Sequence, residues 1–227
     1  KEAENTCSYH LFSKWMGLDI PDQLLIPKQK PNTKSLENSL KILEEMNIKP
    51  KDFIIIQMRA SSLIRTPDKT VWKKLVLRLI ENQHKILFTD SPKKSGDIDL
   101  FIESLNLSDE NKKNVKNYST YSKLISDTIA MASLAKLAIA TDSSLIHIAE
   151  SVGTKSFAIM GPFPGNIRLS TYKNNDWIDA PSKSNCSPCF IHSQKPCPNS
   201  SLEGDSLCYR NLDYDLCIEK IERLLNK

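Results

Sequence analysis

Glycine is scarce in this chain, with only six among 227 residues. The sequence contains neither the G-x-G-x-x-G pattern of dinucleotide-binding turns nor the G-x-x-x-x-G-K-[ST] phosphate loop. Both patterns depend on glycine because a residue without a side chain allows the backbone to turn tightly against a phosphate. Their absence disfavours dinucleotide-dependent dehydrogenases and P-loop kinases.

Long apolar runs are also missing, and none approaches the roughly 18–20 residues that a membrane-spanning helix needs. The chain does not open with the basic and apolar regions of a signal peptide. Its first residues read instead like the middle of a domain, so we expect a fragment of a longer protein. The net charge is only +4, with basic and acidic residues interspersed. Nucleic-acid binders usually carry a basic face, so this balance favours small anionic ligands and not nucleic acid.

Cysteine is absent from the whole body of the chain between Cys7 and Cys186. A secreted disulfide scaffold would spread its cysteines evenly, so this distribution predicts a reducing cytoplasm. The spacing C-x2-C-x7-C-x10-C places four thiols in a loop that otherwise lacks core residues, at Cys186, Cys189, Cys197 and Cys208. Tetrahedral ligation of a structural zinc would fix such a loop. Disulfides and free thiols are the alternatives.

Short apolar runs alternate with helical patterns from Phe53 onward. We predict six strands, at Phe53–Met58, Lys85–Phe88, Val115–Tyr118, Leu137–Ala140, Phe157–Met160 and Trp177–Ile178. Helices are predicted at Lys69–Asn82, Asp97–Leu105, Tyr121–Leu134 (inner face Leu124, Ile125, Thr128, Ile129 and Met131), Leu145–Val152 and Asp213–Leu225 (inner face Leu216, Ile218, Ile221 and Leu224). Strands and helices that alternate in this way form a parallel sheet with right-handed crossovers. The predicted fold class is therefore α/β, a doubly wound Rossmann-like domain.

The first 49 residues follow a different pattern. An amphipathic helix is predicted at Glu2–Met16, with an apolar side of Tyr9, Phe12, Trp15 and Met16. Three prolines in Pro21–Lys34 predict a linker. A second helix is predicted at Ser35–Met46, with an apolar face of Leu36, Leu40, Ile42 and Leu43. We therefore divide the chain into 1–49 and a domain at 50–227, which includes a cysteine-rich loop at 185–210.

The stretch Lys136–Pro162, KLAIATDSSLIHIAESVGTKSFAIMGP, predicts a compact strand–helix–strand unit. Its first strand is joined to its helix by four residues whose side chains can accept a backbone N–H bond, Thr141, Asp142, Ser143 and Ser144. The free N–H groups and positive dipole end of that helix would point at the carboxyl edge of the sheet. Open α/β sheets bind ligands at that edge. We therefore predict that this turn holds the phosphates of a nucleotide-linked substrate.

Within this turn the side chains have different expected roles. Asp142 is expected to cap the helix or order the loop, because a carboxylate repels a phosphate. Ser143 and Ser144 would present N–H and hydroxyl groups to the ligand. His147 lies one helical turn further along the same face and can reach a phosphate or a sugar hydroxyl. A purely structural histidine is the alternative.

Two further loops follow predicted strands and should meet the same edge. In the loop after the first strand, Arg59 and Arg65 can fork onto phosphate oxygens, with Ser61 and Ser62 donating hydroxyls. Two solvated arginines are the alternative here. The loop Thr89–Pro92 after the second strand favours a plain turn over a ligand contact.

The segment TDSSLIHIAESVGTKSFAIMGPFP resembles the donor-site signature of glycosyltransferase family 9, the heptosyltransferase-like enzymes. IIIQMRASSLIRTP and the following TVWKKLVLRLIENQHKILFTD resemble the family's first strand, phosphate loop and helix in its C-terminal half. The tail from SNCSPCF onward resembles the cysteine-rich tail and final helix of many members. This resemblance, which covers about residue 51 to the end, implies a GT-B fold of two Rossmann-like domains. The chain would supply the C-terminal donor-binding half, with 1–49 as the end of the acceptor domain and the interdomain linker.

By motif, the resemblance implies that the donor diphosphate contacts Ser61, Arg65, Ser143, Ser144 and His147. Ser144 stands where many members have glycine. The implied enzyme transfers a sugar from a nucleoside-diphosphate sugar to a glycan or lipopolysaccharide-type acceptor in the cytoplasm, with peripheral membrane association through a lipid-linked acceptor. No cofactor is expected for transfer, because helix dipole, Arg and His can offset the charge of the leaving group. The general base would lie in the acceptor domain. A non-catalytic nucleotide-sugar binding module and a GT-B-like 2-epimerase are the alternatives.

Overall fold

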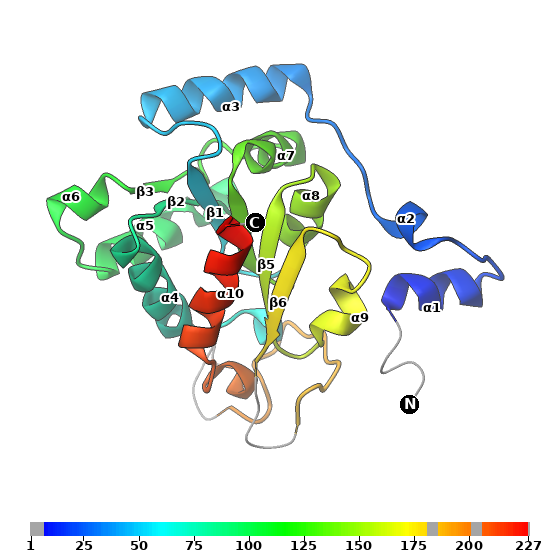
Figure 1. Ribbon diagram of the computed structural model, residues 1–227. Coiled ribbons are helices and arrows are strands. Elements are labelled where there is room, and N and C mark those ends of the chain that lie inside the picture. The colour runs from blue at the N-terminus through cyan, green and yellow to red at the C-terminus, as the bar shows by residue number, and fades with distance from the viewer. Residues whose placement is uncertain (1–6, 181–185, 201–205, 227) are drawn as a thin grey trace.

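A parallel six-stranded sheet forms the centre of the molecule, in the order β3-β2-β1-β4-β5-β6 (Figure 1). The computed structural model describes residues 7–180, 186–200 and 206–226. The strands are β1 (Phe53–Gln57), β2 (Lys85–Phe88), β3 (Val115–Asn117), β4 (Leu137–Thr141), β5 (Lys155–Met160) and β6 (Asn175–Asp179). All six predicted strands are present, and the predicted doubly wound α/β fold is confirmed.

The order of the strands reverses between β1 and β4, which lie side by side at the centre of the sheet. Strand β1 pairs with β2 on its other side, while β4 pairs with β5. The loops that follow β1 and β4 therefore leave the carboxyl edge of the sheet in opposite directions. A crevice opens at such a reversal, and open α/β sheets bind ligands there.

Helices cover both faces of the sheet. The helices are α1 (Ser8–Trp15), α2 (Asp22–Leu25), α3 (Thr33–Glu45), α4 (Lys69–Glu81), α5 (Ser95–Ser104), α6 (Asp109–Lys112), α7 (Ile125–Leu134), α8 (Ser144–Ser151), α9 (Gly165–Leu169) and α10 (Tyr214–Asn226). Helices α4, α5 and α10 share one apolar core with the sheet, and in Figure 1 α10 crosses in front of the strands beside α4. Helices α3, α7, α8 and α9 contribute to the core on the other face.

The two faces of the central strand β4 differ in the size of their side chains. Towards α4 and α10 the central strands present large side chains such as Ile139 and Phe157. Towards α7 and α8, β4 presents Ala138 and Ala140, and the neighbouring strand β5 adds Ala158. Successive strand residues point to opposite faces, so the small side chains all lie on one face and α8 packs closely against the sheet. This close packing fixes where the N-terminal end of α8 lies at the carboxyl edge of the sheet.

Helix α7 starts later than predicted, at Ile125 instead of Tyr121. The carboxylate of Asp127 accepts the backbone N–H of Leu124 and so begins the helix there. Leu124 and Ile125, predicted to face inward, are 66% and 67% exposed. The buried face consists of Ala130, Met131 and Ala132.

The predicted apolar faces of the N-terminal segment are also wrong in part. Phe12, Trp15 and Met16 are exposed, and the described part of this helix begins only at Ser8. Helix α3 buries Ser35, Ser39 and Leu43, because Ser35 hydrogen-bonds to Ser126 and Asp127 of α7 and draws this side of the helix inward. In α10, Leu216 is likewise exposed. The prediction missed the short helices α2, α6 and α9.

The division of the chain at residue 50 stays a prediction. Helix α3 packs on α7, and the N–H of Gln29 donates to the carbonyl oxygen of Ser151 at the end of α8. Tyr9 of α1 contacts Tyr172 beyond α9. Among the helices that the structure describes, none is long and apolar enough to span a membrane.

Gly161 offers a test of packing close to the carboxyl edge. A Cβ atom on Gly161 would lie 2.4 Å from the ring of the fully buried Tyr209. We predict that Gly161→Ala lowers the free energy of unfolding by about 1–3 kcal/mol, the usual cost of overpacking a core. Gly96 at the start of α5 has no neighbour within 4 Å of its ideal Cβ. Gly96→Ala should leave stability unchanged or raise it by up to about 1 kcal/mol. Equal denaturant midpoints for the two variants would contradict the prediction.

Candidate functional site

A cleft of about 640 Å³ lies at the carboxyl edge of the sheet, between the loops that follow β1, β2 and β4. Seven of the nine predicted ligand-binding residues line this cleft, namely Arg59, Ser61, Arg65, Asp142, Ser143, Ser144 and His147. Its four cationic side chains, Arg59, Arg65, Lys94 and Arg168, outnumber the two carboxylates, Asp90 and Asp142. The cleft therefore suits an anion.

Two of the predicted residues, Ser62 and Thr141, do not line the cleft. Ser62 is buried and its hydroxyl bonds to Ser193. Thr141 points inward. Its side chain is fully buried, and its hydroxyl lies 2.7 Å from the carbonyl oxygen of Arg65 and 3.1 Å from that of Ile159. Tyr209 donates to the same Arg65 oxygen at 3.1 Å. Thr141 thus holds the backbone of the Arg65 loop, and its position does not support a contact with a diphosphate.

Arg65 is the centre of the cleft's hydrogen-bond network. Its Nη1 donates to the backbone oxygen of Asp142 at 2.9 Å and to Oδ2 of the same residue at 3.0 Å. Its Nη2 donates to the hydroxyl of Ser61 and to Nε2 of His192, both at 2.9 Å. Because arginine cannot accept, Nε2 of His192 is the acceptor. Arg65 thereby joins three separate segments of the chain.

Asp142 pairs with Arg65 in a largely buried salt bridge, with side chains 11% and 5% exposed. Nε of Arg168 lies 3.8 Å from the same carboxylate oxygen. The two guanidinium groups and one carboxylate leave a net charge of +1 beside the cleft. Asp142 orders the loop, as one of its two expected roles requires, and does not cap α8.

Arg59 is held between two carboxylates. Its Nε donates to Asp90 at 3.0 Å and its Nη1 to Asp97 at 2.9 Å. The hydrogen bond and charge of Arg59 lower the pKa of Asp97 below its usual value. The guanidinium of Arg59 thus ties the β1 loop to the β2 loop. Asp90, in a loop expected to be a plain turn, takes part in the site.

The N-terminal end of α8 is capped by a residue from the neighbouring strand. Oε1 of Gln57, at the end of β1, accepts from the hydroxyl of Ser143 at 2.9 Å and from the N–H of Leu145 at 3.3 Å. Ser144, the first residue of the helix, is exposed in the cleft. The helix therefore presents its positive dipole end to the cleft.

His147 lies one turn into α8 and is mostly buried. Burial lowers the pKa of its imidazole below the ordinary value; Asp142 opposes this shift, and Arg168 and Arg65 add to it. The imidazole is therefore neutral at neutral pH. Its Nδ1 lies 2.6 Å from the hydroxyl of Tyr172, and within the described part of the chain its Nε2 has no hydrogen-bond partner. This second nitrogen is available to a ligand.

The cysteine-rich loop forms part of the site, which sequence patterns did not predict. The hydroxyl of Ser62 donates to the carbonyl of Ser193 at 2.6 Å and accepts its N–H at 3.2 Å. Gln194 donates to the carbonyl of Ser61 and lines the cleft. Ser206 donates to the carbonyl of Ile64 at 2.8 Å. No periodic pattern marks these residues, whereas Arg168 follows the end of β5 and could have been found by the strand-end rule.

The four cysteines of the loop form no disulfide in the structure. Burial raises the pKa of Cys208 to about 12, and Cys197, Cys189 and Cys186 add to this shift. Among the described residues, however, no group of three or more His, Cys, Asp or Glu is arranged to hold a metal ion. Structural zinc at Cys186, Cys189, Cys197 and Cys208 stays a prediction, which metal analysis of the purified protein would test.

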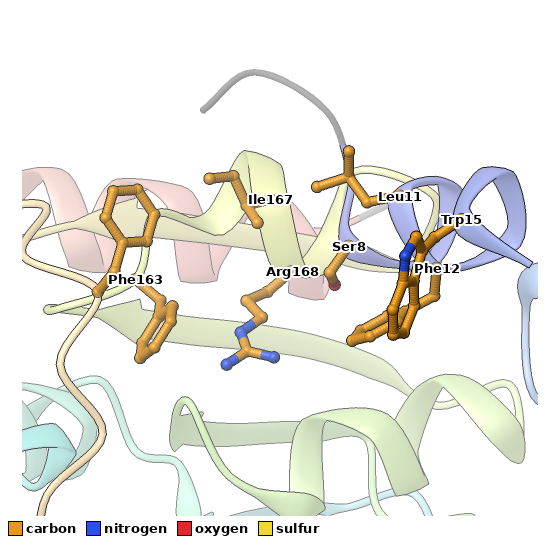
Figure 2. Close-up of a pocket in the computed structure, with 8 residues that line it drawn as sticks. Ser8, Leu11, Phe12, Trp15, Phe163, Ile167 and Arg168 are labelled. Atoms are coloured by element: carbon orange, nitrogen blue, oxygen red, sulfur yellow. The ribbon is translucent and has the colours of Figure 1, made fainter. Parts of the chain in front are cut away.

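A second, apolar groove of about 710 Å³ adjoins the cleft (Figure 2). Phe12 and Trp15 of α1 lie on one side of it, and Phe163 lies across from them. Arg168 lines both hollows, and its guanidinium lies 4.4 Å from the centre of the Phe163 ring. Helix α1 thus lines the apolar groove beside the cleft.

The family model described as "Glycosyltransferase family 9 (heptosyltransferase)" matches residues 8–199. No curated protein matches the chain. The fold of the chain is similar to that of the Escherichia coli ADP-heptose lipopolysaccharide heptosyltransferase II, with a TM-score of 0.67, 13% identity and coverage of 91% of this chain and 56% of that one. The fold is also similar to that of a family 9 glycosyltransferase from Veillonella parvula, with a TM-score of 0.65, 13% identity and coverage of 88% of this chain and 53% of that one. For the E. coli heptosyltransferase WaaC with ADP, the TM-score is 0.57 at 14% identity, with coverage of 95% of this chain and 54% of that one. The chain spans about half the length of these structures.

The buried pair of Arg65 and Asp142 predicts a large stability effect. Arg65→Ala leaves a buried carboxylate with only the more distant Arg168, and we expect the free energy of unfolding to fall by about 3 kcal/mol. Arg78→Ala is the matched control, because it breaks only exposed pairs with Glu81 and Asp215 and should cost less than about 1 kcal/mol.

A double variant makes this prediction sharper. Adding Asp142→Ala to Arg65→Ala removes the unpaired charge, so it should lower stability little further in urea unfolding. Independent, additive losses for the two substitutions would contradict the coupling.

Proposed function

The chain belongs to glycosyltransferase family 9, and we propose that it binds the diphosphate of a nucleoside-diphosphate sugar in the cleft at the carboxyl edge of its sheet. In the whole protein this domain would act as the donor-binding half of a glycosyltransferase. The neighbours solved with ADP and with an ADP-linked heptose analogue support a nucleotide-sugar donor.

One observation carries the proposal. Ser61 and Arg65 of the loop after β1 meet His147 and the N-terminal end of α8, which follows β4, in a single cleft where the strand order reverses. Hydroxyl groups, a guanidinium, an imidazole N–H and a helix dipole are all suited to phosphate oxygens. The net charge of +1 on Arg65, Asp142 and Arg168 adds to this attraction.

These groups also suit the departure of a diphosphate. In the proposed reaction an acceptor hydroxyl displaces the nucleoside diphosphate with inversion at the sugar carbon. The leaving group gains negative charge as the bond breaks, and donors already in place stabilise that charge without reorganising. We propose that Arg65, His147 and the α8 dipole do this, so that transfer requires no metal.

The remaining roles rest on the whole protein. We propose a glycan or lipopolysaccharide-type acceptor, a general base outside this chain, and action in the cytoplasm at the membrane surface where a lipid-linked acceptor is anchored. The Escherichia coli neighbour with the TM-score of 0.67 is described as an ADP-heptose lipopolysaccharide heptosyltransferase, which supports this acceptor class. Incubating the whole protein with nucleotide sugar, with and without acceptor, and analysing the products would distinguish transfer from epimerisation and from binding alone.

Calorimetric titration with ADP, GDP and UDP and their sugar conjugates tests the donor site. His147→Ala should weaken the affinity for the preferred nucleoside diphosphate about 10-fold or more, because it removes a hydrogen bond to a charged group. His84→Ala is the matched control: His84 is also mostly buried, but it pairs with Glu222 at the opposite edge of the sheet. It should leave the affinity unchanged.

Two results would contradict the proposal. One is an unchanged affinity in His147→Ala. The other is the absence of binding by every nucleoside diphosphate, with the protein shown to be folded by circular dichroism.

A further inference from the structure

Two tyrosines extend from His147 away from the cleft. The hydroxyl of Tyr172, in the turn after α9, lies 2.6 Å from Nδ1 of His147 and 3.1 Å from the hydroxyl of Tyr9 in α1. The ring of Tyr172 meets the imidazole edge-on at a centroid distance of 5.7 Å and stacks with Tyr9 at 6.4 Å. Hydrogen bonds therefore run from the N-terminal helix to the candidate donor site.

The chemistry of these groups determines which of them donates and which accepts in each of the two hydrogen bonds. Burial, with contributions from Tyr9, raises the pKa of Tyr172 well above its ordinary value, so it remains a hydroxyl with one proton to give. The imidazole is neutral, and its bare nitrogen is a better acceptor than a phenol oxygen. Tyr172 thus donates to Nδ1 of His147 and accepts from Tyr9. Each bond polarises the next and strengthens it.

This direction decides what His147 presents to the cleft. A neutral imidazole carries one proton, and a nitrogen that accepts a hydrogen bond cannot carry it. If Nδ1 accepts from Tyr172, the proton lies on Nε2, the nitrogen without a partner in the described part of the chain. The reverse arrangement would place a lone pair at Nε2, which repels phosphate oxygens.

We propose that Tyr172 is a positioning residue that fixes the Nε2–H tautomer and the ring orientation of His147 for a phosphate oxygen, and that Tyr9 of α1 orients the Tyr172 hydroxyl. The inference rests on the proposed function and deepens it. It links the N-terminal segment to the donor site, because a displacement of α1 removes the outer hydrogen bond of the chain. Neither tyrosine lines the cleft itself.

Nitrogen NMR of the imidazoles reads the hydrogen bond without any ligand. With His147→Gln used to assign the signals, the wild-type protein should show Nδ1 unprotonated and hydrogen-bonded, with the proton on Nε2. In Tyr172→Phe the Nδ1 signal should move toward that of an unbonded nitrogen. Tyr214→Phe is the matched control, since the Tyr214 hydroxyl has no hydrogen bond within the described residues and the residue lies in α10. A proton on Nδ1 in the wild type, or an unchanged Nδ1 signal in Tyr172→Phe, would overturn the proposal.

Titration with the preferred nucleoside diphosphate gives the functional readout. Tyr172→Phe should weaken affinity about 5-fold, the effect of one neutral hydrogen bond, and Tyr9→Phe should weaken it less. Combining Tyr172→Phe with His147→Ala should cost no more than His147→Ala alone, because Tyr172 acts through His147. Additive losses would overturn the positioning role, and an unchanged affinity in Tyr9→Phe would remove Tyr9 from the proposal. If the wild type binds no nucleoside diphosphate, the proposed function fails, whereas the NMR result still tests the hydrogen bond.

Discussion

The buried pair of Arg65 and Asp142 is the interaction on which the organisation of the cleft depends. Asp142 sits at the end of β4 and Arg65 at the end of the loop that follows β1, so their pairing joins the two loops that diverge at the reversal of strand order. Burying a carboxylate alone would cost several kcal/mol. The pair therefore requires both loops to keep their places, and Thr141 and Tyr209 hold the Arg65 backbone in a matching position.

The pair also sets the charge of the cleft. A single arginine at this depth would be strongly desolvated, while an arginine fully neutralised by one carboxylate would attract an anion weakly. Arg168, at 3.8 Å from the shared carboxylate, restores a net positive charge without adding an unpaired cation to the interior. The charge around Arg59 has the opposite sign, because two carboxylates, Asp90 and Asp97, both contact its single guanidinium. The two arginines of one loop thus differ: Arg59 ties the β1 loop to the β2 loop, and Arg65 is the one proposed to bind the diphosphate.

The sheet could be predicted from the sequence because each buried strand is a local apolar run, as in Phe53–Gln57. The members of the site that follow strands, such as Arg65 and His147, could be predicted for a related reason, since parallel strands bring their ends to one edge. Helix faces were less predictable: the exposure of Ile125 depends on Asp127 starting α7 and on small residues packing against it. His192 and Tyr172 could not be predicted, because their positions depend on the path of irregular segments. The inward direction of Thr141 depends on the pleat of β4.

The cleft at the carboxyl edge is also where segments distant in sequence are brought together. The loop that carries the cysteines reaches Arg65 through His192, and it reaches Ser62 in the loop after β1 through Ser193. At the other end of the chain, α1 reaches His147 through Tyr172. Both connections include hydrogen bonds. The connection from α1 is also packed, because the buried Tyr172 belongs to the apolar core beside α8 and stacks with Tyr9. In the proposed function, the sheet fixes where a diphosphate would bind, while these two outer segments orient Arg65 and His147, the residues proposed to hold it.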